Sequence, residues 1–301
     1  MGKNFNLFLI DGEVTGRIKC SIANWTGLAY KIPRAYLDKC KDRKDLKQSG
    51  VYFLFGKNEE DEDSVYIGQA GIRKNGEGIL LRIQEHLKDN FYFTDAVVLT
   101  TQNNSFGPTE ISYLENKFTN IAIKTDRYNV INGNDPNPGN VTEEKESELL
   151  EFVKYSKTIL GVLGYKVFVP VLEKNTTKDT TLYLSRKIKR SDRTISAKCK
   201  RTSEGFVVLS GSMIEETNSH AIPETLKELR KKCLENNEII DGKITKNYLF
   251  NSPSYAASFV LGMNTNGRVD WRNKDGITLK KLEETENKIK EQENKNRGSN
   301  D

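Results

Sequence analysis

Apolar and polar positions alternate most clearly in two short runs in the first third of the chain. Residues 50–56 read Gly-Val-Tyr-Phe-Leu-Phe-Gly and residues 65–69 read Val-Tyr-Ile-Gly-Gln, with an acidic loop between them. Runs of β-branched and aromatic residues that end in glycine and are joined by a polar loop are typical of a β-hairpin. Side chains alternate faces along a strand, so Tyr52 points away from the face shared by Val51 and Phe53. The pattern predicts a hairpin in which each strand presents one tyrosine.

A turn-rich connection follows the hairpin, and apolar residues then recur at helical spacing. These apolar positions are Ile79, Leu80, Ile83 and Leu87. They predict a helix, on which Arg82 and His86 lie four positions apart and share one side. A second helix is predicted to begin at Pro108. Its core stripe consists of Ile111, Leu114, Phe118 and Ile121.

Further elements are predicted on both sides of this segment. Residues 96–101, Ala-Val-Val-Leu-Thr-Thr, form a strand that completes a three-stranded sheet with the hairpin. The other predicted elements are strands at 6–10, 17–23, 28–32 and 165–172, a charged helix or linker at 35–46, and a helix at 143–160. The N-terminal strands either pad the sheet, which is the simpler interpretation, or contact a substrate.

The second half of the chain is more polar and more basic. The elements predicted there are strands at 182–188, 205–209 and 269–271 and helices at 225–236 and 252–260. Ser252 is suited to cap the short helix. Beyond Leu282 the chain is almost entirely Glu, Lys and Asn, which predicts a helix that frays into a disordered tail.

Length and composition favour two modest domains. The 301 residues are 36% hydrophobic and 30% charged, which is typical of a highly charged globular protein with a core. We therefore predict an α+β protein, with a small three-stranded antiparallel sheet flanked by helices and a smaller α+β C-terminal region. The expected parts are a β extension at 1–45, a main domain at 46–172, a basic linker and small α+β region at 173–245, a C-terminal module at 246–284 and a charged tail at 285–301.

Several function classes are disfavoured by what the sequence lacks. No apolar run approaches a membrane span and the N-terminus lacks the sections of a signal peptide, so we expect a cytoplasmic protein without a membrane partner. The four cysteines are far apart and lack CxxC spacing, which favours reduced thiols over a zinc site or disulfides. The glycines of 71–78 are not followed by Gly-Lys-Ser/Thr, so no nucleotide or other small-molecule cofactor is expected.

Charge gives a mild indication of a polyanionic partner. The net charge of +5 is shared by many proteins that do not bind nucleic acid. Residues 186–201 contain eight basic residues and one acid, Asp192. Such a run is either a solvated face or an electrostatic contact to phosphates, and both interpretations stay open. In the second interpretation the nucleic-acid contacts are Lys198, Lys200 and Arg201.

The hairpin and the residues after it resemble the GIY-YIG nuclease family. Gly50-Val51-Tyr52 corresponds to the first family triplet, with valine for isoleucine, and Tyr66-Ile67-Gly68 matches the second. Arg82, His86 and the later Tyr113-Leu114-Glu115 follow in the family's order. The resemblance implies a GIY-YIG type fold and hydrolysis of DNA phosphodiester bonds with one divalent metal ion, Mg²⁺ or Mn²⁺. The C-terminal piece resembles a small uncharacterised module that is often appended to such domains.

The resemblance implies roles for three residues around the hairpin. Tyr52 is the expected water-activating residue, although a phenol with a pKa of about 10 needs a cation or a neighbouring base at neutral pH. His86 is expected to orient the water or Tyr52. Tyr66 is expected to support substrate or water through a hydrogen bond.

Other candidate site residues follow from the same resemblance. Arg82 matches the catalytic arginine, whose permanently charged guanidinium can hold two phosphate oxygens. An asparagine after the second helix corresponds to Asn129 or Asn132, and both remain candidates. Gln69 and Arg73 follow the second triplet and are candidate DNA contacts.

Two glutamates compete for the metal ion that the resemblance implies. Glu110 and Glu115 are five residues apart, which separates them by about 140° around a helix, so they cannot readily share one ion. Glu115 follows Leu114 at the edge of the buried stripe, whereas Glu110 lies in the first turn, where the helix dipole favours any acid. We therefore assign the metal to Glu115.

Two functions remain after these assignments. The first is a metal-dependent endonuclease that cleaves DNA, and the second is a catalytically silent nucleic-acid-binding or scaffolding protein with the same fold. Five acids in residues 58–63 would repel DNA if they faced it, so this loop is expected to point away. The joint presence of Tyr52, Tyr66, Arg82, His86 and Glu115 favours the first function.

Overall fold

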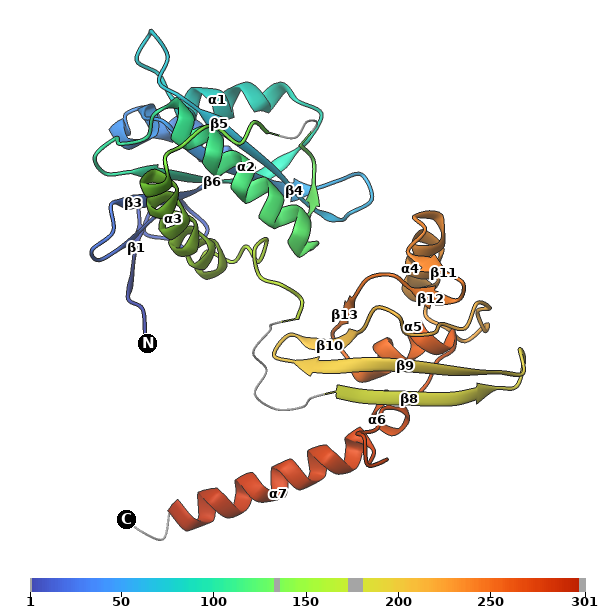
Figure 1. Ribbon diagram of the computed structural model, residues 1–301. Helices are drawn as coiled ribbons and strands as arrows, with labels where there is room; N and C mark the ends of the chain where they lie inside the picture. Colours follow the sequence, from blue (N-terminus) through green and yellow to red (C-terminus); the bar gives the residue numbers. More distant parts are fainter. Residues whose placement is uncertain (1, 133–135, 173–180, 298–301) are drawn as a thin grey trace. The chain divides into compact units, whose positions relative to one another are not determined.

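The computed structural model describes residues 2–132, 136–172 and 181–297 (Figure 1). The chain divides into two compact units, residues 1–170 and 171–301, and each is described by itself. Both contain helices and sheets, so the predicted α+β class is confirmed. No helix within the described residues combines the length and apolarity needed to cross a membrane.

Unit 1 is built on a sheet of seven strands, counted over its described residues, in the order β1-β2-β3-β6-β4-β5-β7. The strands are β1 (Phe5–Leu9), β2 (Ile18–Ile22), β3 (Gly27–Pro33), β4 (Gly50–Lys57), β5 (Asp63–Ala70), β6 (Phe93–Thr101) and β7 (Asn129–Val130). All neighbours are antiparallel except β5 and β7. The predicted hairpin is β4–β5, with β6 beside β4.

The predicted three-stranded sheet is therefore too small, and no boundary at residue 45 separates an N-terminal extension. Residues 96–101 of β6 are buried, so this strand is central and pairs on both edges, with β4 and with β3. Through β3 the sheet continues into β2 and β1. Cys20 and Ala29 share a core cluster with Phe152, as expected if these strands pad the sheet.

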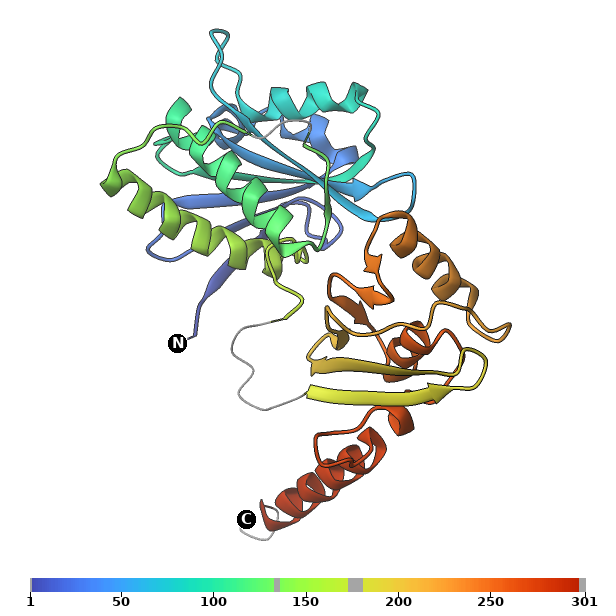
Figure 2. The same cartoon turned by 45° about the vertical axis from the view of Figure 1, so that its right-hand side comes forward.

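Helices cover both faces of this sheet (Figure 2). They are α1 (Ile79–Glu85), α2 (Pro108–Thr125) and α3 (Glu143–Val162). One core joins Phe53 of β4 to Phe118 of α2 and to α3. A second core joins Leu54 to Ile83 of α1 and to two 3₁₀ helices, Arg34–Cys40 and Lys44–Lys47, which occupy the predicted helix or linker at 35–46. Alternation along β4 thus separates the α1 face from the α2 face.

The helix after the hairpin ends earlier than predicted. Regular α-helix stops at Glu85, and His86–Lys88 form a 3₁₀ turn. The tighter turn buries His86 and leaves Leu87 exposed, so Leu87 does not belong to the core stripe as expected.

Unit 2 combines a four-stranded sheet, counted over its described residues, with four helices. The sheet order is β13-β10-β9-β8, all antiparallel, and β11 and β12 form a separate pair. The strands are β8 (Thr181–Ile188), β9 (Arg193–Thr202), β10 (Gly205–Val208), β11 (Ile239–Ile240), β12 (Lys243–Ile244) and β13 (Tyr248–Phe250). The helices are α4 (Glu224–Glu235), α5 (Pro253–Leu261), α6 (Gly267–Asp270) and α7 (Leu279–Arg297).

One core runs through the whole of unit 2. Leu182, Cys233 and Trp271 belong to a single cluster of buried residues, so the boundary expected between 245 and 246 does not separate two bodies. Residues 173–180, at the start of the predicted linker region, and residues 298–301, at the end of the predicted tail, fall outside the described residues. Residues up to 297 of the predicted fraying tail belong to α7.

Two predicted strands are wrong. The segment 165–172 consists of turns, one closed by the Val169 N–H on the Lys166 carbonyl, and it places Tyr165 against the core without pairing. Val269 and Asp270 lie in a short helix, α6, whose first turn is capped by the Asn266 side chain, and Trp271 is its C-cap. In both segments apolar residues are buried by tertiary packing and not by a sheet. The basic run also contains a strand that was not predicted, β9.

Candidate active site

The two hairpin tyrosines lie on the α1 face of the sheet. Tyr52 of β4 stands opposite Gly68 of β5, and Tyr66 stands opposite Leu54. The two rings have centroids 6.2 Å apart. A Cβ atom on Gly68 would lie 2.5 Å from the Tyr52 hydroxyl, so only glycine leaves room for the phenol at this position. This close approach explains the glycine of the second triplet.

A chain of hydrogen bonds runs from Tyr52 through His86 to Asp89. The Tyr52 hydroxyl is 2.7 Å from His86 Nε2, and His86 Nδ1 is 2.5 Å from Asp89 Oδ2. A carboxylate can only accept, so the network assigns the imidazole proton to Nδ1 and leaves Nε2 as acceptor for the Tyr52 O–H. The ring centroids of His86 and Tyr66 are 4.8 Å apart, which holds the imidazole in the pocket.

Burial controls the acidity of Tyr52. The side chain is 1% exposed. Burial raises the pKa of its phenol above the ordinary value, the neighbouring Tyr66 adds to the rise, and the charge of Arg82 opposes it. Tyr52 is therefore protonated at neutral pH, and the acceptor at His86 is the group to which it can pass a proton.

Arg82 lies in a cluster with Arg73 and Glu85. Glu85 accepts two hydrogen bonds from Arg73, at 2.6 and 2.9 Å, and one from Arg82 Nη1 at 2.9 Å. The hydrogen bonds from Arg73 and then Arg82 lower the pKa of Glu85 to about 2. Two guanidinium groups thus converge on one carboxylate beside Tyr52, which is a geometry that also suits a phosphate.

Glu115 lies on α2 and reaches the end of β5 from the other face. Its Oε2 accepts a hydrogen bond of 2.9 Å from Gln69 Nε2. Burial raises the pKa of Glu115, while Gln69 and then the charge of Arg82 lower it. The negative charge of Glu115 also raises the pKa of Tyr52, so side chains on the two faces of the sheet interact electrostatically near the end of β5.

Glu110 has a local structural role. It accepts a hydrogen bond of 3.1 Å from the Gly107 N–H and so caps the first turn of α2. Glu110 and Glu115, the two candidate metal ligands, thus occupy different environments.

The two candidate asparagines also differ. Asn132 accepts a hydrogen bond of 3.1 Å from the Ile67 N–H and donates one of 2.6 Å to the Ile67 carbonyl, so its amide pairs with β5 beside Gly68. Asn129 is exposed and lies opposite Ser64, further along the hairpin. Asn132 is therefore the one next to the site. The acidic loop at 58–63 forms the hairpin tip, at the opposite end of β5 from Gly68.

Sequence reasoning missed two acids of the site, Glu85 and Asp89. Their only signal is spacing, because each lies three residues after a functional side chain, Arg82 or His86, and residues three apart face each other on a helical turn. Gln69 was predicted as a DNA contact, but its amide is bound to Glu115. Arg73 lies beside Arg82 as part of the same cluster.

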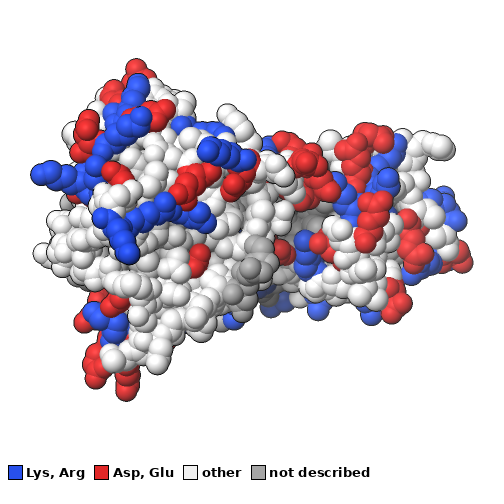
Figure 3. Space-filling model, turned by 90° about the horizontal axis from the view of Figure 1, so that it is seen from above, with Lys and Arg blue, Asp and Glu red and all other residues white. Residues whose placement is uncertain are grey.

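The three basic candidates of unit 2 do not share one face of their sheet. Lys198 and Lys200 share the outer face of β9, whereas Arg201 lies on the opposite face and pairs with Glu286 at 3.0 Å. On the face drawn in Figure 3, lysines and arginines are interspersed with acids.

The donor set is compatible with a single Mg²⁺ or Mn²⁺ ion. The described residues contain no cluster of three or more His, Cys, Asp or Glu side chains suited to a metal. Mg²⁺ does not require one, because it commonly binds one or two carboxylates and fills its remaining positions with water and substrate phosphate. Glu115 is the carboxylate that would supply such a ligand.

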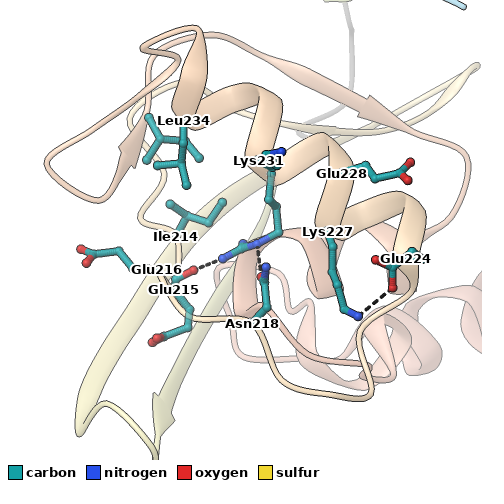
Figure 4. Close-up of a pocket in the computed structure, with 11 residues that line it drawn as sticks. Ile214, Glu215, Glu216, Asn218, Glu224, Lys227, Glu228, Lys231 and Leu234 are labelled. Carbon is teal, nitrogen blue, oxygen red and sulfur yellow. Dashed lines mark hydrogen bonds and ion pairs between the residues drawn. The ribbon is translucent and has the colours of Figure 1, made fainter. Parts of the chain in front are cut away.

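A separate pocket of about 370 Å³ lies in unit 2 (Figure 4). Two of its cations have partners close by: Lys227 donates to Glu224 at 2.7 Å, and Arg230 donates to Asn218 at 2.7 Å and to the carbonyls of Glu215 and Phe259. Arg230 therefore ties α4 to the rest of the unit. We assign this pocket a structural role.

Comparison with known proteins gives a match within unit 2. Residues 187–283 match a family described as "Domain of unknown function (DUF4357)". No curated protein and no solved structure matches the chain. The match is consistent with a C-terminal module, but it begins at residue 187 and not at the predicted start, residue 246. It covers most of the described part of unit 2.

Proposed function

We propose that the protein is a metal-dependent endonuclease that hydrolyses DNA phosphodiester bonds at the site around Tyr52. The observation that carries the proposal is the hydrogen-bonded chain from Tyr52 through His86 to Asp89, beside Arg82 and within electrostatic reach of Glu115. This arrangement joins a proton acceptor, a phosphate-binding cation and a metal-binding carboxylate. The resemblance to GIY-YIG nucleases is consistent with it.

The chain's own residues account for activation of the water. A water that donates a hydrogen bond to the Tyr52 oxygen loses its proton to that oxygen as it attacks phosphorus, and the Tyr52 hydroxyl proton moves to His86 Nε2. The imidazolium that forms is stabilised by the Asp89 carboxylate at 2.5 Å. Tyr52 begins and ends the step protonated, so its raised pKa is no obstacle.

Arg82 and Arg73 bind the phosphate. Both donate to Glu85 in the absence of substrate. A phosphate group can replace the Glu85 carboxylate as acceptor, because its oxygens match the same planar donors. Glu85 thus keeps the two guanidinium groups oriented until substrate arrives.

Glu115 is the residue that would hold the metal. When bound, a divalent ion supplies neutralisation of the phosphate charge and stabilisation of the departing 3′ oxygen. Gln69 orients the Glu115 carboxylate through its hydrogen bond at 2.9 Å.

A plasmid assay tests the proposal. Purified protein should convert supercoiled DNA to open-circle or linear forms with Mg²⁺ or Mn²⁺ and not with chelator. Tyr52→Phe keeps the buried ring but removes the hydroxyl, so it should lower the rate by a factor of about 10²–10⁴. Intact plasmid under every metal condition, with folded protein, would instead favour a catalytically silent binding protein.

A further inference from the structure

The outer face of the β8–β9 hairpin in unit 2 has an unusual combination of side chains. Lys198 of β9 is the antiparallel partner of Tyr183 of β8. On the other edge of β8, Arg272 forms an isolated β-bridge with Tyr183. Directly opposed residues point to the same face of a sheet. A tyrosine that is 39% exposed therefore stands between two cations in one row across the sheet.

A hollow of about 540 Å³ lies beside this tyrosine. Ser185 and Ser196, which are paired across the hairpin, contribute small side chains to its lining. Lys198 and Lys243 also line it, and no acid does so among the described residues. The pocket of Figure 4 differs, since four glutamates line it.

The basic residues on the two faces of the hairpin differ in their ion pairs. On the core side, Arg186, Arg193 and Arg201 pair with Asp270, Glu216 and Glu286, at 3.3, 2.6 and 3.0 Å. On the outer side, Lys198 and Lys200 have no ion pair among the described residues, and Lys187 pairs only with exposed Asp192. The arginines of the basic run are thus neutralised within the unit, and the outward lysines are available to a ligand.

We propose that this outer face binds single-stranded nucleic acid, with a base stacked on Tyr183 and the backbone held by Lys198, Lys200 and Arg272. An exposed aromatic ring within a positive groove is how proteins hold unpaired bases without sequence preference. In duplex DNA the bases are stacked on one another, so Tyr183 would gain nothing there and lysine contacts alone would act. This inference concerns unit 2 and goes beyond the proposed endonuclease activity.

Binding of the full chain to a fluorescent oligothymidylate, measured by anisotropy in chelator, tests the inference. Tyr183→Ala should weaken single-strand binding about tenfold to a hundredfold, whereas Tyr183→Phe should retain it. Lys198→Gln should reduce the slope of log affinity against log salt by about 0.7. Tyr255→Ala and Lys231→Gln, which alter exposed residues elsewhere on unit 2, should change neither quantity.

Photocrosslinking of an iodouracil oligonucleotide locates the contact independently. The expected crosslink lies in the peptide that contains Tyr183. Crosslinks confined to unit 1, or an equal loss of duplex and single-strand affinity in Tyr183→Ala, would overturn the inference. No binding by the native chain would do the same. Because binding is read in chelator, failure here is distinguishable from absence of plasmid cleavage, which alone bears on the nuclease proposal.

Discussion

His86 Nδ1 lies 2.5 Å from a carboxylate oxygen of Asp89, three residues further along the chain. The contact exists because the helix ends at Glu85 and the following 3₁₀ turn begins at His86 and has Asp89 as its C-cap. It fixes which imidazole nitrogen faces Tyr52. In our account Asp89 is therefore a positioning residue, since it acts through His86 and does not touch substrate.

Replacement of Asp89 tests this role. Asp89→Asn can donate to Nδ1 and so permit the wrong tautomer, and we expect kcat to fall on the order of a hundredfold with KM unchanged. Asp89→Glu should recover part of the loss. Asn90→Ala, at the exposed neighbouring position, is the control. Equal kcat values for Asp89→Asn and the native protein would remove Asp89 from the mechanism.

Gly68→Ala should damage both fold and activity. The new methyl group would meet the Tyr52 ring and hydroxyl at 2.5 Å, and both belong to a buried side chain. We expect a loss of about 1–3 kcal/mol in the free energy of unfolding, measured by urea denaturation. Gly161→Ala is the matched control, because it faces open space in α3 and should stabilise the protein by about 0.5–1 kcal/mol. A Gly68→Ala protein as stable as the native one would contradict the packing described for Tyr52.

Glu85→Gln should strengthen DNA binding. The substitution removes the charge that holds Arg73 and Arg82 in the free protein. These ion pairs are partly exposed, so we expect the dissociation constant to fall only about two- to fivefold, measured by anisotropy in chelator. Glu77→Gln, which affects the pair with Lys47, serves as control. Weaker binding by Glu85→Gln would contradict the proposal that a phosphate replaces the Glu85 carboxylate on the two arginines.

As the pH is lowered, metal binding should be lost at a higher pH than for a glutamate with an ordinary pKa. Burial raises the pKa of Glu115, and a protonated carboxyl does not bind Mn²⁺, so affinity is retained above this raised pKa and lost as pH falls through it. Gln69→Ala removes the largest effect that lowers this pKa and should move the loss to higher pH. Calorimetric titration of Mn²⁺ from pH 4 to 8 gives both curves. A midpoint that is unchanged in Gln69→Ala would contradict the assigned contact.

Much of unit 1 could be predicted from sequence because its signals are local. The alternation around Tyr52 and the helical stripe of Leu114 and Phe118 depend only on neighbours in the chain, and both appear in the structure. The pairing of β3 with the second edge of β6 depends on residues far apart in the chain. The pattern of apolar and polar residues in β3 therefore does not predict it. The same limit applies to Tyr165, whose burial depends on a turn and not on a sheet.

Only the part of the candidate site that has a local sequence signal could be predicted. Motif spacing identified Tyr52, Arg82 and His86, but Glu85 and Asp89 became visible only through their contacts. In unit 2, period-two alternation of Ile195, Ala197 and Cys199 was present in the basic run and could have revealed β9. It would also have separated Lys198 from Arg201, which lie on opposite faces.

The stability of Glu115→Gln is a necessary control for the central test. A raised pKa means that the folded state disfavours the charged carboxyl, so Glu115 lowers stability at neutral pH and the loss disappears below its unfolded pKa. Glu115→Gln should therefore unfold at a temperature no lower than the native protein. Any loss of activity can then be attributed to chemistry.

Plasmid cleavage over a Mn²⁺ titration, with Glu115→Gln compared to Glu110→Gln, tests the central claim most directly. Glu115→Gln removes the anionic oxygen assigned to the metal and should lower cleavage at least about a hundredfold. Glu110→Gln can still cap Gly107 and should cleave at near the native rate. Robust cleavage by Glu115→Gln together with an inactive Glu110→Gln, or activity undiminished in chelator, would contradict the account.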